Sequence, residues 1–352
     1  MNTQADRTAT GAETAESADQ SASTAAATES SRLRLRRYVR GNATQLGILT
    51  VFIAVWLFFI IMAPETFLSS RIYRAFMSTV PFFGIIAMPL TMAIIAGEID
   101  LSFPSIMAMG MVSFVLVFQA TGNVALSVLA ALAAGTAIGF LNGAIVVGLG
   151  IPSLVATIGT QFFWRGASLV ILSGQGAALA AARETPIYQA LVGQTIGRIP
   201  NQMWWLLIVT VFSWVLLNRH QLGAHIYLIG DNEDSARLMG VNSTRTRLLV
   251  FAFVGFCAAF GGVLASFHTS YFWPSLGEGY LLQTLGAVFL GGTSVFGGVG
   301  SIFGTILGSF IIGAIGAAIV AIGLTGFWTQ LIYGLILVVS VSLHGLLQRR
   351  MQ

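Results

Sequence analysis

Two carboxylates interrupt an otherwise hydrophobic stretch in the segment 97–102, which reads Gly-Glu-Ile-Asp-Leu-Ser. A charge at membrane depth is costly unless it is solvated or paired, so carboxylates in such a place often mark a solute pathway or a gate. Asp100 and Ser102 can instead cap the next helix by accepting backbone N–H bonds, with Pro104 in its first turn. Glu98 and Asp100 therefore have two candidate uses, in a pathway or in the capping and solvation of a loop.

A third charged residue, Arg165, lies deep in a long apolar run beside Trp164. An unpaired guanidinium would be costly there. Arg165 therefore needs Glu98, Asp100 or backbone carbonyls as partners, or it must extend to the membrane surface. A structural pairing and a contact with a substrate or gate both fit this position.

Uncharged polar residues also occur in apolar segments of the same half of the chain, among them Asn142, Thr157 and Gln161. Such groups suit a neutral polyol, which must bind weakly enough to be released. They equally suit hydrogen bonds between helices. The residues predicted to line a translocation pathway or gate are Glu98, Asp100, Ser102, Asn142, Thr157, Gln161 and Arg165.

The histidines and the single cysteine give no sign of catalysis or metal binding. Cys257 lies in an apolar segment, which offers neither a disulfide framework nor a zinc cluster. The four histidines show no metal-ligand spacing with carboxylates. Since no nucleophile elbow or organised acid–base pair is present, we expect no catalytic residues, no metal ligands and no cofactor.

All seventeen basic residues are arginines. A P-loop ATPase needs a lysine at the β- and γ-phosphates, so the chain is not expected to hydrolyse ATP itself. The arginines cluster at the flanks of apolar runs rather than on one soluble face, which argues against nucleic acid as a partner.

The elements that carry these residues are predicted from composition. The chain has 352 residues, 56% hydrophobic and 9% charged, whereas soluble domains have roughly 25% charged residues. Apolar runs near twenty residues long recur, and each can cross a hydrocarbon core of about 30 Å as a helix. We predict an all-α, polytopic transmembrane helical bundle of about ten spans, some broken by prolines and glycines. The expected spans are 45–63, 76–97, 103–120, 124–148, 152–172, 203–218, 247–268, 281–297, 300–321 and 327–346.

Charge distribution predicts the orientation of the chain. Five arginines between residues 32 and 40 precede the first apolar run, and the positive-inside rule keeps such a segment in the cytoplasm. With ten spans, twelve arginines fall inside and four outside, and both termini are cytoplasmic. Residues 1–31 are predicted to be a disordered cytoplasmic tail rather than a signal peptide. Residues 32–44 form a basic juxtamembrane segment, and 45–348 form the transmembrane domain.

Two long polar connections are candidate docking surfaces, 173–202 outside and 219–246 inside. Within the inner one, residues 231–240 predict a short helix with Asn232 as N-cap, acidic residues in its first turn and Gly240 as its end. This helix has two interpretations. It could dock on a soluble partner, or it could be an ordinary amphipathic helix lying on the membrane surface. Near the C-terminus, glycines recur every four residues from Gly300 to Gly308, which predicts close approach of two helices.

The segment 97–102 resembles the Gly-Gly-Ile-Asp-Leu-Ser signature of the ribose-type permease subunits of ATP-binding-cassette (ABC) sugar importers, with Glu98 in place of the usual glycine. The resemblance extends from about residue 45 to the C-terminus. Further motifs follow in the order shown by that family: Leu141-Asn142-Gly143, Ile151-Pro152-Ser153, Thr157-Ile158-Gly159, Arg165-Gly166, Gly230-Asp231-Asn232, Ala236-Arg237, Gly240-Val241, Gly291-Gly292 and Gly297-Gly298.

This resemblance implies a multi-pass permease of the bacterial cytoplasmic (inner) membrane that imports a monosaccharide or sugar alcohol. It implies two permeases, identical or sister chains, working as a pair in membrane lipid with ABC ATPase subunits inside and an extracytoplasmic sugar-binding protein outside. The short inner helix corresponds to the family's coupling helix, which docks on the ATPase. Its expected coupling residues are Asp231, Asn232, Glu233, Asp234, Ala236, Arg237 and Gly240.

Two alternatives stay open. The same machinery can carry a nucleoside or an amino acid, and the extra carboxylate of Glu98 leaves room for such a change of cargo. An ion-coupled secondary transporter is the second alternative, with Glu98 and Asp100 as proton or sodium sites. In that case the inner docking helix would have no partner to engage.

Overall fold

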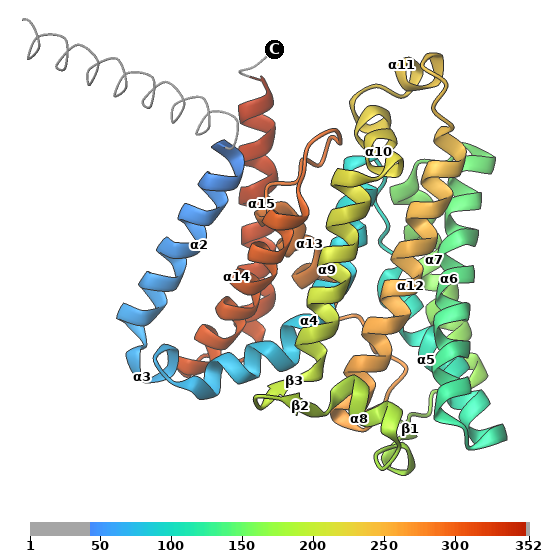
Figure 1. Ribbon diagram of the computed structural model, residues 1–352, viewed down its shortest axis with the longest axis vertical. Coiled ribbons are helices and arrows are strands. Elements are labelled where there is room, and N and C mark those ends of the chain that lie inside the picture. The colour runs from blue at the N-terminus through green and yellow to red at the C-terminus, as the bar shows by residue number, and fades with distance from the viewer. Residues whose placement is uncertain (1–42, 350–352) are drawn as a thin grey trace, which may run out of the picture. The chain divides into compact units, whose positions relative to one another are not determined.

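The computed structural model describes residues 43–349, and they are folded almost entirely into helices (Figure 1). The predicted all-α bundle is confirmed. The predicted tail 1–31, and the basic segment up to residue 42, lie outside the described residues. From Ile48 onward the chain forms one compact unit. The elements are α2 (Ala43–Met62), α3 (Pro64–Phe67), α4 (Ser70–Ile95), α5 (Phe103–Thr121), α6 (Val124–Leu149), α7 (Ser153–Ile171), β1 (Ala177–Ala178), the 3₁₀ helix η1 (Ala180–Ala182), α8 (Pro186–Val192), β2 (Gln194–Ile196), β3 (Ile199–Pro200), α9 (Asn201–Arg219), α10 (Gln221–Asp231), α11 (Glu233–Leu238), α12 (Ser243–Thr269), β4 (Tyr271–Phe272), α13 (Tyr280–Leu290), α14 (Ile302–Ala321) and α15 (Phe327–Arg349).

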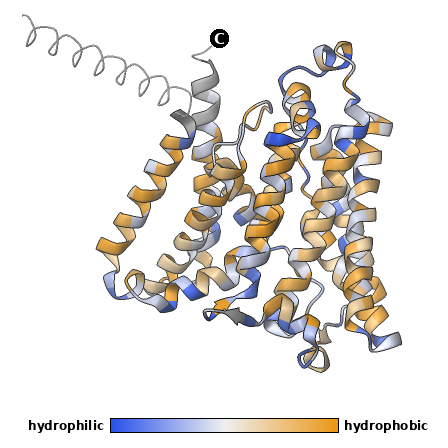
Figure 2. Cartoon of the chain, viewed as in Figure 1, coloured by the Kyte–Doolittle hydropathy of each residue, from blue (hydrophilic) through white to orange (hydrophobic). Residues whose placement is uncertain are grey.

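Eight of the described helices are long and apolar enough to cross a membrane: α2, α4, α5, α6, α7, α9, α12 and α14. Two further apolar helices are shorter, over Tyr280–Leu290 and Phe327–Ser342. Figure 2 shows hydrophobic ribbon along most of the helices, with hydrophilic residues gathered in the connections. The number of crossings and the side on which each terminus lies remain predictions.

The span predicted at 281–297 is wrong in its C-terminal part. The helix there, α13, has 11 residues and rises only about 16 Å, so it is too short to cross a bilayer alone. The chain leaves the helix after Leu290, and Gly292 and Gly297 adopt φ angles of 82° and 84°, which favour glycine. Apolar composition alone could not distinguish this broken segment from a full span.

The proline breaks are also only partly as predicted. Pro81 and Pro89 lie inside α4 without ending it, which is tolerated in membranes where neighbouring helices surround the freed backbone groups. Pro104 lies in the first turn of α5, and Pro152 is the N-cap residue of α7. The second pair therefore starts helices, as proline's fixed φ angle favours.

The core is centred on α4, whose second half is almost entirely buried against α9, α12 and α14. Small residues allow the closest helix contacts. A Cβ atom at Gly304 would lie 2.0 Å from the carbonyl oxygen of Gly291, and one at Gly308 would lie 2.2 Å from that of Ala287. The close approach predicted from the C-terminal glycine repeat is confirmed between α13 and α14.

The two long polar connections contain short helices and strands and lie at opposite ends of the helices (Figure 1). The one at 173–202 contains η1, α8 and three short strands, of which β1 pairs with β4 and β2 with β3. The one at 219–246 contains α10, α11 and the first turn of α12. A Cβ atom at Gly230 would lie 1.7 Å from the carbonyl oxygen of Ile95, so the end of α10 is packed directly on the end of α4.

Candidate functional site

The connection between α4 and α5, residues 96–102, runs along the first turns of α7. The backbone N–H of Ile99 donates to the Ser153 hydroxyl at 3.0 Å, and that of Leu101 donates to the Thr157 hydroxyl at 3.1 Å. Ser153 and Thr157 are one helical turn apart, so the extended connection follows the helix by alternate residues. Thr157 is fully buried. Its hydroxyl, predicted to line a pathway, contacts the backbone of this connection.

A hydrogen-bonded row joins Asp100, Ser102 and Asn142 in the interior. Asp100 Oδ1 accepts from the Ser102 backbone N–H at 2.8 Å and from the Ser102 hydroxyl at 2.5 Å. Asn142 Nδ2, on α6, donates to the same hydroxyl at 2.6 Å. Asp100 Oδ2 and Asn142 Oδ1 are buried with no hydrogen-bond partner among residues 43–349. Such orphaned acceptors are costly and are suited to a donor such as a solute hydroxyl or water.

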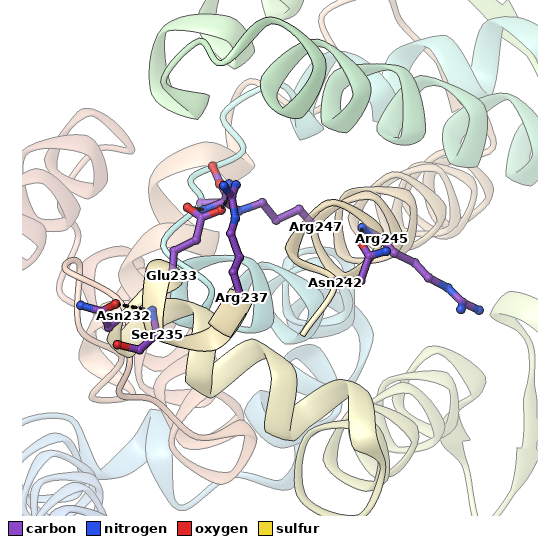
Figure 3. A network of polar contacts seen from close by, with 8 residues as sticks. Asn232, Glu233, Ser235, Arg237, Asn242, Arg245 and Arg247 are labelled. Atoms are coloured by element: carbon purple, nitrogen blue, oxygen red, sulfur yellow. Dashed lines mark hydrogen bonds and ion pairs between the residues drawn. The ribbon is translucent and has the colours of Figure 1, made fainter. Parts of the chain in front are cut away.

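Glu98 does not join this row, although it is only two residues from Asp100. Its carboxylate pairs with Arg247 near the start of α12, at 2.8 Å between Oε1 and Nε. The Arg247 guanidinium also bonds Glu233 of α11 at 2.6 Å, and Glu233 bonds Arg237 at 2.7 Å. Figure 3 shows the side chains of Arg237 and Arg247 converging on that of Glu233. The pairing explains how a carboxylate is accommodated at the position where the sugar-permease signature usually has glycine.

The Glu98–Arg247 pair is shielded from solvent. The Glu98 side chain is 8% exposed and that of Arg247 is 18% exposed. Burial raises the pKa of the Glu98 carboxyl, whereas the Ser153 hydroxyl and the Arg247 guanidinium act to lower it. Because a buried carboxylate is costly without a counter-charge, Arg247 offsets part of the cost of burying Glu98.

The short helix predicted within 231–240 is confirmed as α11. The Asn232 side chain caps its start by accepting from the Ser235 N–H at 2.8 Å. At its end, Gly240 has φ +82°, its N–H donates to Arg237 O at 2.9 Å, and the Val241 N–H donates to Ala236 O at 3.0 Å. This is a Schellman motif, in which a left-handed glycine closes the helix.

The outer surface of α11 is apolar at its end and acidic at its start. Leu238 is 90% exposed and Met239 is 62% exposed, whereas Ala236 is buried against Ile229 of α10 and Val241. Asp231 ends α10, and Asp234 lies exposed in the first turn of α11. Figure 1 shows α11 at the far end of the helices, between α10 and α12. A protruding, capped helix with exposed large apolar side chains is suited to a protein partner.

Arg165 is held by a different set of residues. Its guanidinium donates to the carbonyls of Pro274, Leu276 and Pro104 and pairs with Glu278 at 3.4 Å between Nε and Oε1. Of the partners expected from the sequence, the backbone carbonyls are found, but the carboxylate is Glu278 rather than Glu98 or Asp100. Arg165 thereby ties α7 and α5 to the non-helical segment before α13.

The structure thus divides the predicted pathway residues. Asp100, Ser102, Asn142 and Thr157 are brought together around the 96–102 connection, Glu98 joins α11 through Arg247, and Arg165 lies elsewhere. Gln161 is half-buried one turn beyond Thr157 on α7. Sequence reasoning counted Arg247 only as an inner positive charge. The signal available for it was a lone arginine at the start of a long apolar span, where Glu98 needs a counter-charge.

Comparison with known proteins gives a family and several relatives. The family described as "Branched-chain amino acid transport system / permease component" matches residues 72–341. The ribose import permease protein of Escherichia coli K12 is 28% identical over 281 residues, which cover 80% of this chain and 87% of the relative. The autoinducer 2 import system permease protein of Yersinia enterocolitica is 30% identical over 268 residues, covering 74% of this chain and 81% of the relative. The ribose import permease protein of Haemophilus influenzae is 29% identical over 259 residues, covering 73% and 80%. No solved structure matches the chain.

Proposed function

Because the chain belongs to the family of permease components of the branched-chain amino acid transport type, we propose that it is the membrane-spanning subunit of an ABC importer that carries a monosaccharide or sugar alcohol into the cell. The chain is a multi-pass protein of the bacterial cytoplasmic (inner) membrane and a permease rather than an enzyme. The observation that carries the proposal is the match along 80% of the chain to a ribose import permease.

A neutral sugar fits the chemistry of the Asp100, Ser102 and Asn142 row. Asp100 Oδ2 and Asn142 Oδ1 are acceptors without partners in the part of the chain that the structure describes, and sugar hydroxyls are donors. The signature 97–102 and two ribose permeases among the relatives favour the same substrate class. The autoinducer 2 permease in the comparison shows that the cargo varies among similar permeases.

The energy for transport comes, in this proposal, from ATP hydrolysed by partner subunits that dock on α11. Leu238 and Met239 provide exposed apolar contacts on that helix, and the positive-inside rule assigns this end to the cytoplasm. With six residues, α11 spans about 9 Å, a length better suited to a groove on a partner than to anchoring on a lipid surface.

The remaining partners follow from the same assembly. A second permease, identical or a sister chain, pairs with this one in the lipid bilayer. An extracytoplasmic sugar-binding protein docks at the opposite end, where α8 and the short strands form an ordered surface.

An uptake assay with defined candidate cargoes tests the substrate class. The permease, its ATPase subunits and the co-purifying binding protein are reconstituted in liposomes, and uptake of labelled D-ribose, D-xylose, D-glucose, ribitol, uridine and leucine is compared. We expect saturable, ATP-dependent uptake of a sugar or the sugar alcohol. Uptake confined to uridine or leucine would overturn the proposed cargo and leave the importer assignment in place.

The ion-coupled alternative is disfavoured by the partners of its two carboxylates. Glu98 already faces a guanidinium, which repels a bound cation, and one oxygen of Asp100 accepts two bonds from Ser102. Uptake driven by a sodium or proton gradient in liposomes without ATPase subunits would overturn the importer proposal itself.

A further inference from the structure

The ion pairs of Glu98 and Arg247 join three segments that are far apart in the sequence. Arg247 lies on α12, Glu98 in the connection after α4, and Glu233 on α11. One guanidinium contacts both carboxylates, at 2.8 and 2.6 Å. The contact with Glu233 is a hydrogen bond as well as an ion pair, whereas the contact with Glu98 is an ion pair in which Arg247 Nε makes no hydrogen bond with any described residue. We call Glu98, Arg247 and Glu233 the ionic bridge.

From the ionic bridge, contacts lead directly to the polar row. Ile99, the residue after Glu98, donates to Ser153 on α7. Asp100, the next residue, is bonded to Ser102, which accepts from Asn142 on α6. A displacement of α11 that moves Glu233 would therefore be transmitted to the 96–102 connection. In that connection Ile99 and Leu101 are hydrogen-bonded to α7, beside the polar row.

We propose that Glu98 and Arg247 are positioning residues that couple movement of α11 to the 96–102 connection. The inference rests on the proposed function, since it takes α11 to be the element moved by the ATPase. Hydrophobic contacts of Ile229, Ala236 and Val241 also hold α11, but they are non-directional. The ionic bridge adds a charge-to-charge link between α11 and Glu98 through one guanidinium group.

Burial determines how strongly the bridge acts. With side-chain exposures of 8% for Glu98 and 18% for Arg247, salt screens the pair much less than a surface pair. Removal of Arg247 leaves the buried Glu98 carboxylate without this counter-charge, whereas removal of Glu98 leaves Arg247 still paired with Glu233. The exposed contact between Arg237 and Glu233, with Arg237 at 59% exposure, adds less, because surface pairs contribute little.

The test measures coupling separately from folding. Glu98→Gln, Arg247→Gln and the double variant are reconstituted with the ATPase subunits and binding protein, and D-ribose uptake and ATP hydrolysis are measured together. If D-ribose proves not to be carried, the best-transported sugar of the panel above replaces it. Glu65→Gln and Arg71→Gln, exposed and remote from the bridge, remove the same charges as matched controls. Thermal unfolding in detergent identifies variants that fail to fold. If Arg247→Gln fails to fold, the milder variant Arg247→Lys replaces it.

We expect each single variant to keep ATP hydrolysis while uptake per ATP falls about tenfold, within the range of coupling between linked sites. The double variant should fall no further than Arg247→Gln alone, because that change already removes the contact with Glu98. Wild-type uptake per ATP in all three variants would overturn the inference, as would additive losses in the double variant. An inactive wild-type complex would instead count against the proposed function.

Discussion

Asp100, Ser102 and Asn142 form their row at the point where the chain passes from α4 into α5. The Ser102 hydroxyl is central to it, because it donates to Asp100 and accepts from Asn142. Asp100 is also completely buried, so the energetic cost of its carboxyl depends on these few bonds. The same compact geometry leaves one acceptor on Asp100 and one on Asn142 for a solute or water.

Ser102→Ala tests the row as a structural unit. The substitution removes one donor to Asp100 and the acceptor for Asn142, so we expect the free energy of unfolding to fall by about 1–3 kcal/mol. Thermal unfolding in detergent measures the change. Ser113→Ala is the control, because the Ser113 hydroxyl donates to the Met109 carbonyl of its own helix, away from the row. An equal loss of unfolding free energy in both variants would show that the row contributes no more to stability than an ordinary hydroxyl within a helix.

At this scale the sequence identified which residues are unusual but not what they contact. Glu98, Asp100 and Arg165 could be recognised because charges are costly in apolar runs. Their partners depend on tertiary packing. Arg165 finds Glu278, which is 113 residues away, and Glu98 finds Arg247, which is 149 residues away. No local spacing rule connects either pair.

Among the elements, α11 is the one most fully determined by local sequence. Asn232 at its start and Gly240 at its end are capping residues with recognisable chemistry, and both act as predicted. By contrast, α13 ends sooner than its apolar sequence indicates. A helix end in an apolar segment is set by glycine conformation and by contact with α14, which hydrophobicity does not report.

Gly240→Ala tests whether the shape of α11 matters for transport. An alanine at φ +82° is strained, at a cost of about 1–2 kcal/mol, so the end of α11 should shift from its docking position. We expect uptake per ATP to fall while the transmembrane helices stay folded. Gly148→Ala is the control, since Gly148 has no neighbouring atom within 4 Å of an added Cβ. Unchanged coupling in Gly240→Ala would argue against a docking role for α11.

Gly304→Ala tests the contact between α13 and α14. Its Cβ would approach the Gly291 carbonyl oxygen to 2.0 Å, so the two backbones must separate. We expect a loss of stability of about 1–3 kcal/mol, typical of overpacking, seen as a lower unfolding temperature in detergent. At Gly334 on α15 an added Cβ meets no atom within 4 Å, so Gly334→Ala should cause no such loss.

Across the whole molecule, the two ends of the helices carry different structures. One end bears α10, α11 and the ionic bridge, and the other bears α8 and the short strands. Arginine distribution assigns the first end to the cytoplasm. This assignment decides which partner can reach which surface, so it underlies both docking proposals.

Cysteine labelling in intact cells checks the orientation. Cys257 is the single cysteine and is buried, so Cys257→Ala provides a background without reactive thiols. We expect a membrane-impermeant maleimide to label Glu184→Cys in intact cells, and to label Leu238→Cys only after permeabilisation. The reverse pattern would place α11 outside and exclude contact with a cytoplasmic ATPase.

The most direct test of the central claim is sugar uptake by the reconstituted complex with a partner ATPase that hydrolyses ATP, and with a variant of that ATPase that binds ATP without hydrolysing it. We predict accumulation of D-ribose, or of the sugar best transported in the panel, only with the hydrolysing ATPase and undiminished when ionophores dissipate ion gradients. Equal uptake with the inactive ATPase, or uptake abolished by the ionophores, would contradict the account.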